Sequence, residues 1–362
     1  MIDYLLEQND AFTPWSDLDY QIDNGYTNVS GLAYATYLIN PDFEADSLDG
    51  NHRDLYYSFV PVTNTLQRET VETKGAQNQW NIAYGGNYEN KLYYGLSLGI
   101  QTFRYAQDKT YEEIPLETGL ALNNFRLEEH LRITGAGVNV SGGLIFRPIP
   151  TIRLGVNFVS PTYLRLTDTY DANINVNYNN VEFEENGEIR VLNNENAETD
   201  IIESTYALLT PWRANFGIAA FISKRGFISA DLEYVNYSQA KFSDPDPNFS
   251  FAGDNTSIQN LYTSALNLRL GGEIRVDKLR FRAGLAYYGD PFDNPEDNID
   301  RSKMIYTLGG GVRHKNYYFD LGFSYNQTDS YYSPYSLFDG GQPQVSTQTS
   351  QVNLQFGIGM LF

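Results

Sequence analysis

The stretch Val352-Asn353-Leu354-Gln355-Phe356-Gly357-Ile358-Gly359-Met360-Leu361-Phe362 alternates apolar side chains with polar or very small ones, and only Leu361 breaks the alternation. Successive side chains of a β-strand point to opposite faces, so this period of two predicts a strand with one apolar and one polar face. Helical spacing does not fit it. The same pattern recurs upstream at residues 92–101, 266–275, 279–288 and 317–326. The sequence therefore predicts an all-β protein.

Short turns alternate with long polar loops along the chain. We expect turns at 87–90, 147–150, 223–226, 276–278 and 314–316. We expect loops near 106–127, 170–203, 241–258, 289–301 and 328–346. Acidic residues gather in the loops, whereas the turns carry Lys224, Arg225, Lys278 and Lys315. Outer-membrane barrels sort their connections in this way, with periplasmic turns and extracellular loops. The fold class that we predict is a transmembrane antiparallel outer-membrane β-barrel.

The expected strands number eleven, and the first and last run in the same direction. Six run one way, near 77–88, 130–147, 204–222, 259–276, 302–314 and 346–362. Five run the other way, near 91–105, 151–167, 226–241, 278–289 and 316–328. Single-chain bacterial barrels normally have an even number of strands. The count, and the lack of a signal-peptide pattern at Met1–Glu7, predict further strands before Met1. We expect residues 1–65 to be an extracellular loop or partly helical insertion, and 66–362 to be barrel.

The composition excludes several classes of protein and site. The 25 basic and 45 acidic residues give a net charge of −20, which argues against a nucleic-acid partner. The chain lacks cysteine, so disulfides and thiolate metal sites are excluded. No apolar run is long enough for a transmembrane helix. Aromatic residues make up 15% of the chain, including 29 tyrosines, which suit a membrane–water interface. Composition alone leaves a soluble β-sandwich as an alternative.

The candidates for catalysis and metal binding are few. The histidines are His52, His130 and His314, placed in a loop, at a loop edge and in a turn, so we expect neither a catalytic pair nor a metal site. The acidic run between Asp290 and Asp300 has ligands that suit calcium, but it lacks the calcium-loop spacing, so a solvated loop is favoured. We expect no enzyme activity and no cofactor. Tyr331, Tyr332, Tyr335 and Phe338 fit an upper aromatic girdle better than a ligand entrance.

Charged side chains on the polar face of the strands point to a lumen. An arginine that faced lipid at the membrane midplane would cost about 2–4 kcal/mol, so these residues are expected to face inward. Ion pairing within the lumen is the favoured role; the alternative is that one guanidinium receives the carboxylate of a ligand. The basic members are Arg153, Arg213, Arg269, Arg275, Arg280 and Arg282, and the acidic ones are Asp231, Glu233, Glu273 and Asp320. The candidate ligand-binding residues are Arg153, Arg213, Arg269, Arg280 and Arg282.

Several segments resemble the FadL-type outer-membrane transporters of hydrophobic compounds, in particular a Bacteroidota-like branch. They are Gly85-Gly86-Asn87-Tyr88, Lys91-Leu92-Tyr93-Tyr94-Gly95, Phe146-Arg147-Pro148-Ile149-Pro150-Thr151-Ile152-Arg153-Leu154-Gly155, Ser160-Pro161-Thr162-Tyr163, Thr210-Pro211-Trp212-Arg213 and Ala230-Asp231-Leu232-Glu233-Tyr234-Val235-Asn236-Tyr237-Ser238. The resemblance covers roughly residues 30–362. It implies a barrel of about 14 strands, of which the chain shows about 11. The family's N-terminal hatch and kinked third strand have no counterpart in this sequence.

The resemblance also implies a function. It implies passive uptake of hydrophobic small molecules, above all long-chain fatty acids, across the bacterial outer membrane. The expected partners are this ligand and the outer-membrane lipid. Three alternatives stay open: a non-transporting scaffold that binds a protein partner during secretion or surface attachment, an outer-membrane enzyme, and a hydrophilic porin. A scaffold would have a lumen filled by charge pairs and no apolar pocket.

Overall fold

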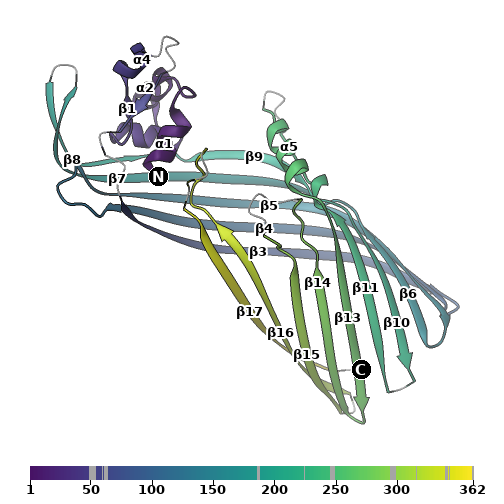
Figure 1. Ribbon diagram of the computed structural model, residues 1–362. Helices are drawn as coiled ribbons and strands as arrows, with labels where there is room; N and C mark the ends of the chain where they lie inside the picture. Colours follow the sequence, from purple (N-terminus) through teal and green to yellow (C-terminus); the bar gives the residue numbers. More distant parts are fainter. Residues whose placement is uncertain are drawn as a thin grey trace.

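The fold combines a large β-sheet with a small group of helices at its N-terminal end (Figure 1). The computed structural model describes residues 1–48, 54–58, 60, 64–185, 188–223, 225–244, 249–293, 299–314, 316–338, 341 and 343–360. Several residues named above lie outside these: His52, Lys224, Lys315, Leu361 and Phe362, together with Glu296 and Asp297 of the acidic run. None of the described helices is both long and apolar enough to cross a membrane.

Four short helices precede the large sheet and are called the helical cap. They are α1 (Ile2–Asn9), α2 (Trp15–Asn24), α3 (Val29–Ala35) and α4 (Phe43–Leu48), with the small pair β1 (Asn40–Pro41) and β2 (Tyr56–Tyr57). Asn28 caps α3, because its side-chain oxygen accepts the backbone N–H of Gly31 at 2.8 Å. The extracellular location of this segment stays a prediction.

The large sheet has 15 strands, and every neighbouring pair in it is antiparallel. The all-β fold class is therefore confirmed. The strands are β3 (Thr65–Tyr88), β4 (Leu92–Pro115), β5 (Leu122–Ile149), β6 (Ile152–Val159), β7 (Tyr163–Glu185), β8 (Glu188–Glu198), β9 (Ile202–Leu209), β10 (Arg213–Ile222), β11 (Gly226–Asn236), β12 (Lys241–Ser243), β13 (Ser264–Val276), β14 (Leu279–Tyr288), β15 (Lys303–His314), β16 (Tyr317–Tyr332) and β17 (Val345–Met360).

Eleven passes run along this sheet, as the sequence predicted. β6 continues into β7 beside β5, and β8, β9 and β10 follow one another on the next pass; the three-residue β12 adds only a short edge. Two further elements interrupt the connections, the 3-10 helix η1 (Tyr237–Gln239) and the helix α5 (Ala252–Leu261). The strand expected from residue 259 therefore begins only at Ser264, after α5.

Two of the expected loops are strands in the structure, so those predictions are wrong. β4 runs to Pro115 and β5 begins at Leu122, which leaves a short turn where a loop at 106–127 was expected. The expected loop at 170–203 is largely formed by β7 and β8. Charged and polar residues face each other across these strands, as Asp108 faces His130, so the apolar alternation that marks a half-buried strand is missing there. These stretches are called the sheet extension.

The two faces of the sheet differ in polarity. On the outer face, alternate residues of each pass are apolar, tyrosine, alanine or glycine over a stretch of seven to eleven residues, nine on most passes, called the apolar band. The band comprises 80–88, 92–100, 138–146, 152–158, 216–222, 228–234, 266–276, 279–287, 304–312, 317–325 and 352–360. Trp80 is 73% exposed there and Ile358 86%, whereas Asn267 on the opposite face is only 2% exposed. The polar face is thus the enclosed, inner one.

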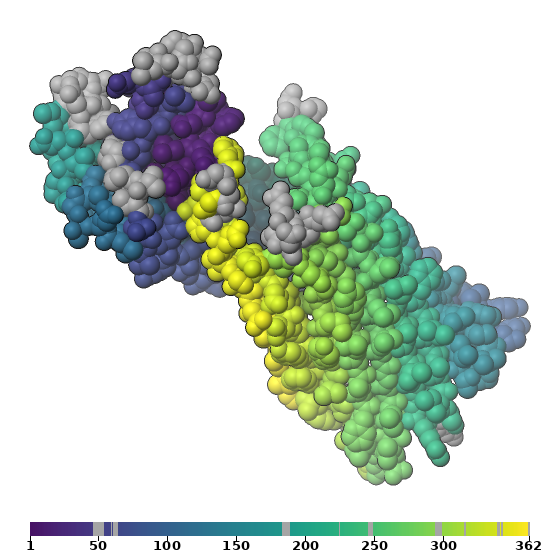
Figure 2. Space-filling view, viewed as in Figure 1, coloured from purple at the N-terminus to yellow at the C-terminus, as the bar shows by residue number. Residues whose placement is uncertain are grey.

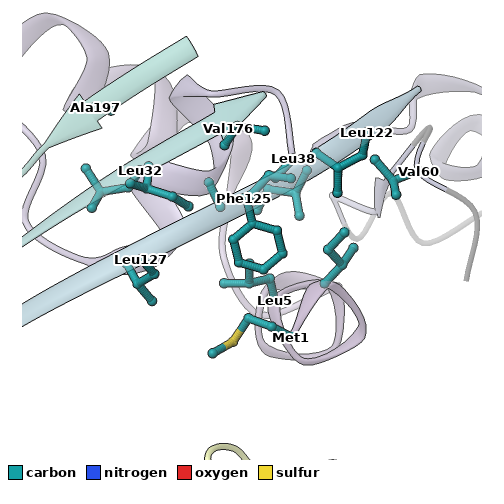
Figure 3. Packing of buried hydrophobic residues seen from close by; sticks show 14 of the residues in the cluster. Met1, Leu5, Leu32, Leu38, Val60, Leu122, Phe125, Leu127, Val176 and Ala197 are labelled. Carbon is teal, nitrogen blue, oxygen red and sulfur yellow. The ribbon is translucent and has the colours of Figure 1, made fainter. Parts of the chain in front are cut away.

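The helical cap packs on the inner face of the sheet extension. Phe125 of β5 is fully buried against the cap, and Leu5 and Leu32 from α1 and α3 belong to the same cluster (Figure 3). Figure 2 shows the cap and α5 as two separate protrusions at the same end of the molecule. The cap therefore covers the inner face at one end of the strands, beyond the apolar band.

The sheet has two edges among the described residues. β3 pairs only with β4 and β17 only with β16, so no hydrogen-bonded ladder joins β3 to β17. Near the cap, however, the hydroxyl of Tyr332 donates to Glu69 at 2.8 Å, and the amide of Gln67 donates to the hydroxyl of Tyr335 at 2.8 Å. These contacts join the two sides of the sheet only at the capped end.

Candidate functional site

A hollow of about 730 Å³ lies on the inner face of β11 and β13–β17. Its floor is formed by glycines, among them Gly271, Gly284 and Gly309, which leave space because they have no side chain. A second hollow of about 420 Å³ lies over β4–β6 and β10, and Asp231 lines both. The two hollows therefore share Asp231 as a lining residue.

Three arginines surround one carboxylate that lines the first hollow. Glu273, 6% exposed, accepts from Arg275 Nε at 2.6 Å, from Arg280 Nη1 at 3.1 Å and from Arg282 Nε at 2.8 Å. Arg282 also donates to Asp320 at 2.8 Å. These five side chains carry one positive charge in excess of the negative ones. The cluster can therefore attract an anion even though its arginines are already paired.

Arg269 belongs to a separate network nearer the capped end. It donates to Glu233 at 3.1 Å and to the hydroxyl of Tyr288 at 3.2 Å, while its guanidinium lies 5.3 Å from the Tyr288 ring centroid. Asn267 also donates to Glu233, at 2.8 Å. This network holds the arginine in one orientation.

Arg153 and Arg213 differ from the other three candidates. The guanidinium of Arg153 lies 4.5 Å above the ring of Phe221, a cation–π contact across β6 and β10. Arg213 begins β10 and is exposed. Neither makes an ion pair with a described residue, so no carboxylate of the described chain occupies either guanidinium. The structure thus groups Arg280 with Arg282 and places Arg153, Arg213 and Arg269 apart from them.

An aromatic cluster that the sequence analysis missed lies at the capped end, beside α5. Tyr206 contacts Phe242 and Phe251 with ring centroids 5.6 and 5.8 Å apart, and Phe249 lies 5.1 Å from Phe251. Asn255 of α5 holds Phe242 in place, because it accepts the backbone N–H at 2.8 Å and donates to the carbonyl at 2.9 Å. The sequence feature that could have predicted this cluster is the presence of three phenylalanines, Phe242, Phe249 and Phe251, within ten residues of a polar loop.

The loop after β16 folds back on the cap. The ring of Tyr335 lies 5.8 Å from that of Tyr4 and 6.4 Å from that of Tyr111, and Phe338 lies 6.2 Å from Phe12. The expected girdle therefore does not include Tyr335 and Phe338, which pack against the cap. The rings found at the capped end of the apolar band include Trp212, whose ring centroid lies 5.7 Å from that of Phe158 and 5.4 Å from that of Tyr234.

The remaining candidates have structural contacts. His130 Nδ1 lies 2.7 Å from Asp108, which also accepts from Arg132 at 2.6 Å. The hydrogen bonds from His130 and Arg132 hold the pKa of the Asp108 carboxyl below its usual value. Asp290 accepts the backbone N–H groups of Phe292 and Arg301, so this part of the acidic run shapes a turn. The part of the chain that the structure describes contains no group of three metal-ligating side chains.

Comparison with known proteins gives structural likenesses only. No protein-family model matches the sequence, and no curated protein matches it. Among solved structures, a Pseudomonas aeruginosa FadL homologue is 14% identical, with a TM-score of 0.49 over 80% of this chain and 67% of that one. The P. putida toluene transporter TodX is 12% identical, with a TM-score of 0.41 over 84% of this chain and 91% of that one. The CymD monoaromatic hydrocarbon channel is also 12% identical, with a TM-score of 0.39 over 82% of this chain and 87% of that one.

Proposed function

We propose that this chain forms the wall of a β-barrel in a bacterial outer membrane and gives hydrophobic small molecules a passive route across it. The observation that carries the proposal is the apolar band. Its length of nine residues on most passes suits a tilted transmembrane strand. In water such a surface would expose large apolar side chains such as Trp80, Ile82 and Ile358, which are 73%, 67% and 86% exposed.

Aromatic residues at both limits of the band support this location. Trp80, Tyr163 and Trp212 lie at its capped end, and Tyr88 and Tyr317 lie at the other. Rings with an apolar body and a polar tip favour the two membrane interfaces. Both limits are therefore where a bilayer of ordinary thickness would place them.

The inner face supports passage of amphipathic molecules. The cluster of Tyr206, Phe242 and Phe251 offers apolar contact at the capped end, and the hollows beyond it carry arginines. An alkyl chain gains about 0.8 kcal/mol for each CH₂ that it buries. A carboxylate at its end suits a guanidinium, which makes two parallel hydrogen bonds. We propose long-chain fatty acids as the ligand class and the five arginines, Arg153, Arg213, Arg269, Arg280 and Arg282, as its candidate partners.

Arg153 and Arg213 are the first of these to test. A long-chain fatty acid and the alcohol of equal chain length are compared for binding to the full chain in detergent by equilibrium dialysis. If the arginines receive the carboxylate, the acid binds about 10–100 times more tightly than the alcohol, as a charge-assisted hydrogen bond predicts. R153A/R213A removes this preference, and R68A, on the outer face, keeps it. Equal binding of acid and alcohol by the unaltered chain contradicts the ligand class.

The location is tested separately with the three tryptophans, Trp15, Trp80 and Trp212. Single-tryptophan variants are reconstituted into vesicles that contain lipids brominated at the acyl chains. The proposal predicts strong quenching for Trp80 and Trp212 and none for Trp15 of the cap. If Trp80 fluoresces as strongly in brominated as in ordinary lipid, the membrane location is wrong.

A scaffold that binds a protein partner is the second candidate. The observation that favours it is the inner face itself, where the Glu273 cluster and the Glu233 network form charge pairs. Purification of the full chain from outer membranes without a bound apolar molecule, but with a stoichiometric protein, would support this function over transport.

A further inference from the structure

Five basic side chains lie on the outer face at the capped end of the apolar band, one in its last row and four directly beyond it. They are called the basic belt: Lys74, Arg104, Arg132, Arg165 and Lys241. The strand register gives the height of each side chain, meaning its distance along the strands from the band, counted in outer-face cross-strand rows. Lys241 shares a cross-strand row with Trp80, the last row of the band. Arg165 lies one row further along the strands, Arg104 two rows, and Lys74 and Arg132 three rows.

Three of these cations surround one small side chain. Lys74 and Arg132 face Ala106 from its two sides, and Arg104 precedes Ala106 by two residues on β4. Diagonal neighbours across adjacent strands are about 7–8 Å apart, so Arg104 lies that far from both Lys74 and Arg132. Long basic side chains reach over such a gap, and the methyl group of Ala106 leaves the space between them open.

Positive and negative charges are separated by height on this part of the outer face. The one row between those of Trp80 and Arg104 holds only neutral residues besides Arg165, such as Asn78, Thr102 and Ala136. The acids lie further from the band: Glu203 three rows away, and Glu72, Asp108 and Asp171 four rows away. The chain as a whole has 45 acidic and 25 basic residues, whereas the outer-face rows nearest the band carry basic side chains and no acidic ones. An anion is therefore favoured on the side of the belt that faces the band.

Among the described residues, the other side of the wall has no such belt at the same height. There the outer-face rows beyond the band pair Gln327 with Ser350 and Asp329 with Gln348. Within the belt, Arg104 and Arg165 are exposed and make no ion pair with any described residue, whereas Arg132 is paired with Asp108. Arg104 and Arg165 thus have positive charge that nothing in the described structure neutralises.

We infer that the basic belt binds the phosphate groups of anionic lipids in the leaflet on the side of the helical cap. The inference rests on the proposed membrane location. Strands rise about 3.3 Å per residue, so Arg165 and Arg104 lie about 7 and 13 Å along the strand beyond the end of the band. Headgroup phosphates lie just outside the hydrocarbon region, which is where snorkelling lysine and arginine side chains meet them. The threonines beside the belt, Thr102, Thr134 and Thr167, add hydroxyl donors.

The test compares two double variants that remove equal charge from the same face. R104Q/R165Q removes the unpaired cations, and R68Q/R126Q removes two cations that lie in one row far from the band and are paired with Glu112 and Glu128. Diphosphoryl lipid A, a lipid with two headgroup phosphates, is titrated into the full chain in zwitterionic detergent. Each basic group near an anionic surface changes the binding constant about fivefold, so R104Q/R165Q is expected to bind roughly 25 times more weakly. R68Q/R126Q is expected to bind as the unaltered chain does.

Three results overturn the inference: equal affinity in both double variants, equal binding of a dephosphorylated lipid, and full displacement by inorganic phosphate, which would make the belt a site for the free ion. Quenching of Trp80 by brominated lipid separates the two proposals. If Trp80 is quenched and lipid A binding does not depend on Arg104 and Arg165, only the basic belt is misassigned. If Trp80 is not quenched, the membrane location fails first.

Discussion

At the scale of single residues, Glu273 is the side chain on which the inner face depends most. It is 6% exposed and accepts from three arginines. In E273Q these arginines would repel one another without a central negative charge, and breaking such a buried pair costs about 3–5 kcal/mol. We expect the urea midpoint of the variant in detergent to fall clearly. E112Q, whose partner Arg68 is 3.6 Å away and exposed, should cost no more than about 1 kcal/mol. Equal midpoints for the two variants would contradict this role.

Asp108 gives a residue-scale prediction about pH, at a position beyond the apolar band. Its pKa is lowered by hydrogen bonds from His130 and Arg132. Because the folded-state pKa lies below the unfolded one, the stabilisation is present above the unfolded value of 3.8 and is lost as the pH falls through the folded value. In R132Q we expect the carboxyl to titrate at higher pH, seen as a shifted carbon-13 titration of Asp108. R126Q, on the same face, should leave the curve unchanged; no change in R132Q would refute the assignment.

At the scale of elements, the sequence predicted those strands that have one apolar face and missed those that do not. β13, β14, β16 and β17 follow the alternation because one face of each strand is apolar and exposed and the other face makes polar contacts. The sheet extension has charged pairs outside and the cap inside, so its pattern depends on contacts with distant residues. Arg280 and Arg282 were placed on the inner face by the same alternation, but their shared partner Glu273 could not be chosen without the register between β13 and β14.

The packing of the cap on the sheet extension is the element-scale contact most open to test. Phe125 is fully buried between α1, α3 and the sheet. F125A should lose about 3–5 kcal/mol of packing, because the cavity lies in a cluster with little room to collapse. We expect faster hydrogen exchange across residues 1–48 and unchanged exchange in β13–β16. F356A serves as the control, since Phe356 is 69% exposed on the outer face. Faster exchange throughout the sheet in F125A would show that the cap and the barrel wall unfold together.

At the scale of the whole molecule, the two sheet edges set a geometric constraint. β3 and β17 lie at opposite edges of eleven antiparallel passes and therefore run in the same direction, so they cannot join by the antiparallel pairing found everywhere else in the sheet. Among the described residues, the two sides are connected at the capped end, by the hydrogen bonds of Tyr332 with Glu69 and of Tyr335 with Gln67 and by the ring contact of Tyr335 with Tyr111. The distance between the edges should therefore be better fixed near the cap than in the apolar band.

Spin labels can measure this difference, because the chain has no cysteine and each introduced one is labelled alone. One pair is placed near the cap, at Thr73 and Gln348, and the other in the band, at Tyr84 and Phe356. We expect a narrow distance distribution for the first pair and a broader one for the second. Y332F/Y335F removes the Tyr332 hydrogen bond and the hydroxyl acceptor for Gln67, each worth about 1 kcal/mol, and should broaden the first distribution towards the second. Y331F, whose ring lies on the outer face away from this contact, is the matched control. A narrow distribution for the band pair would instead show that β3 and β17 contact each other directly in the apolar band, so that the two edges of the sheet are joined there as well.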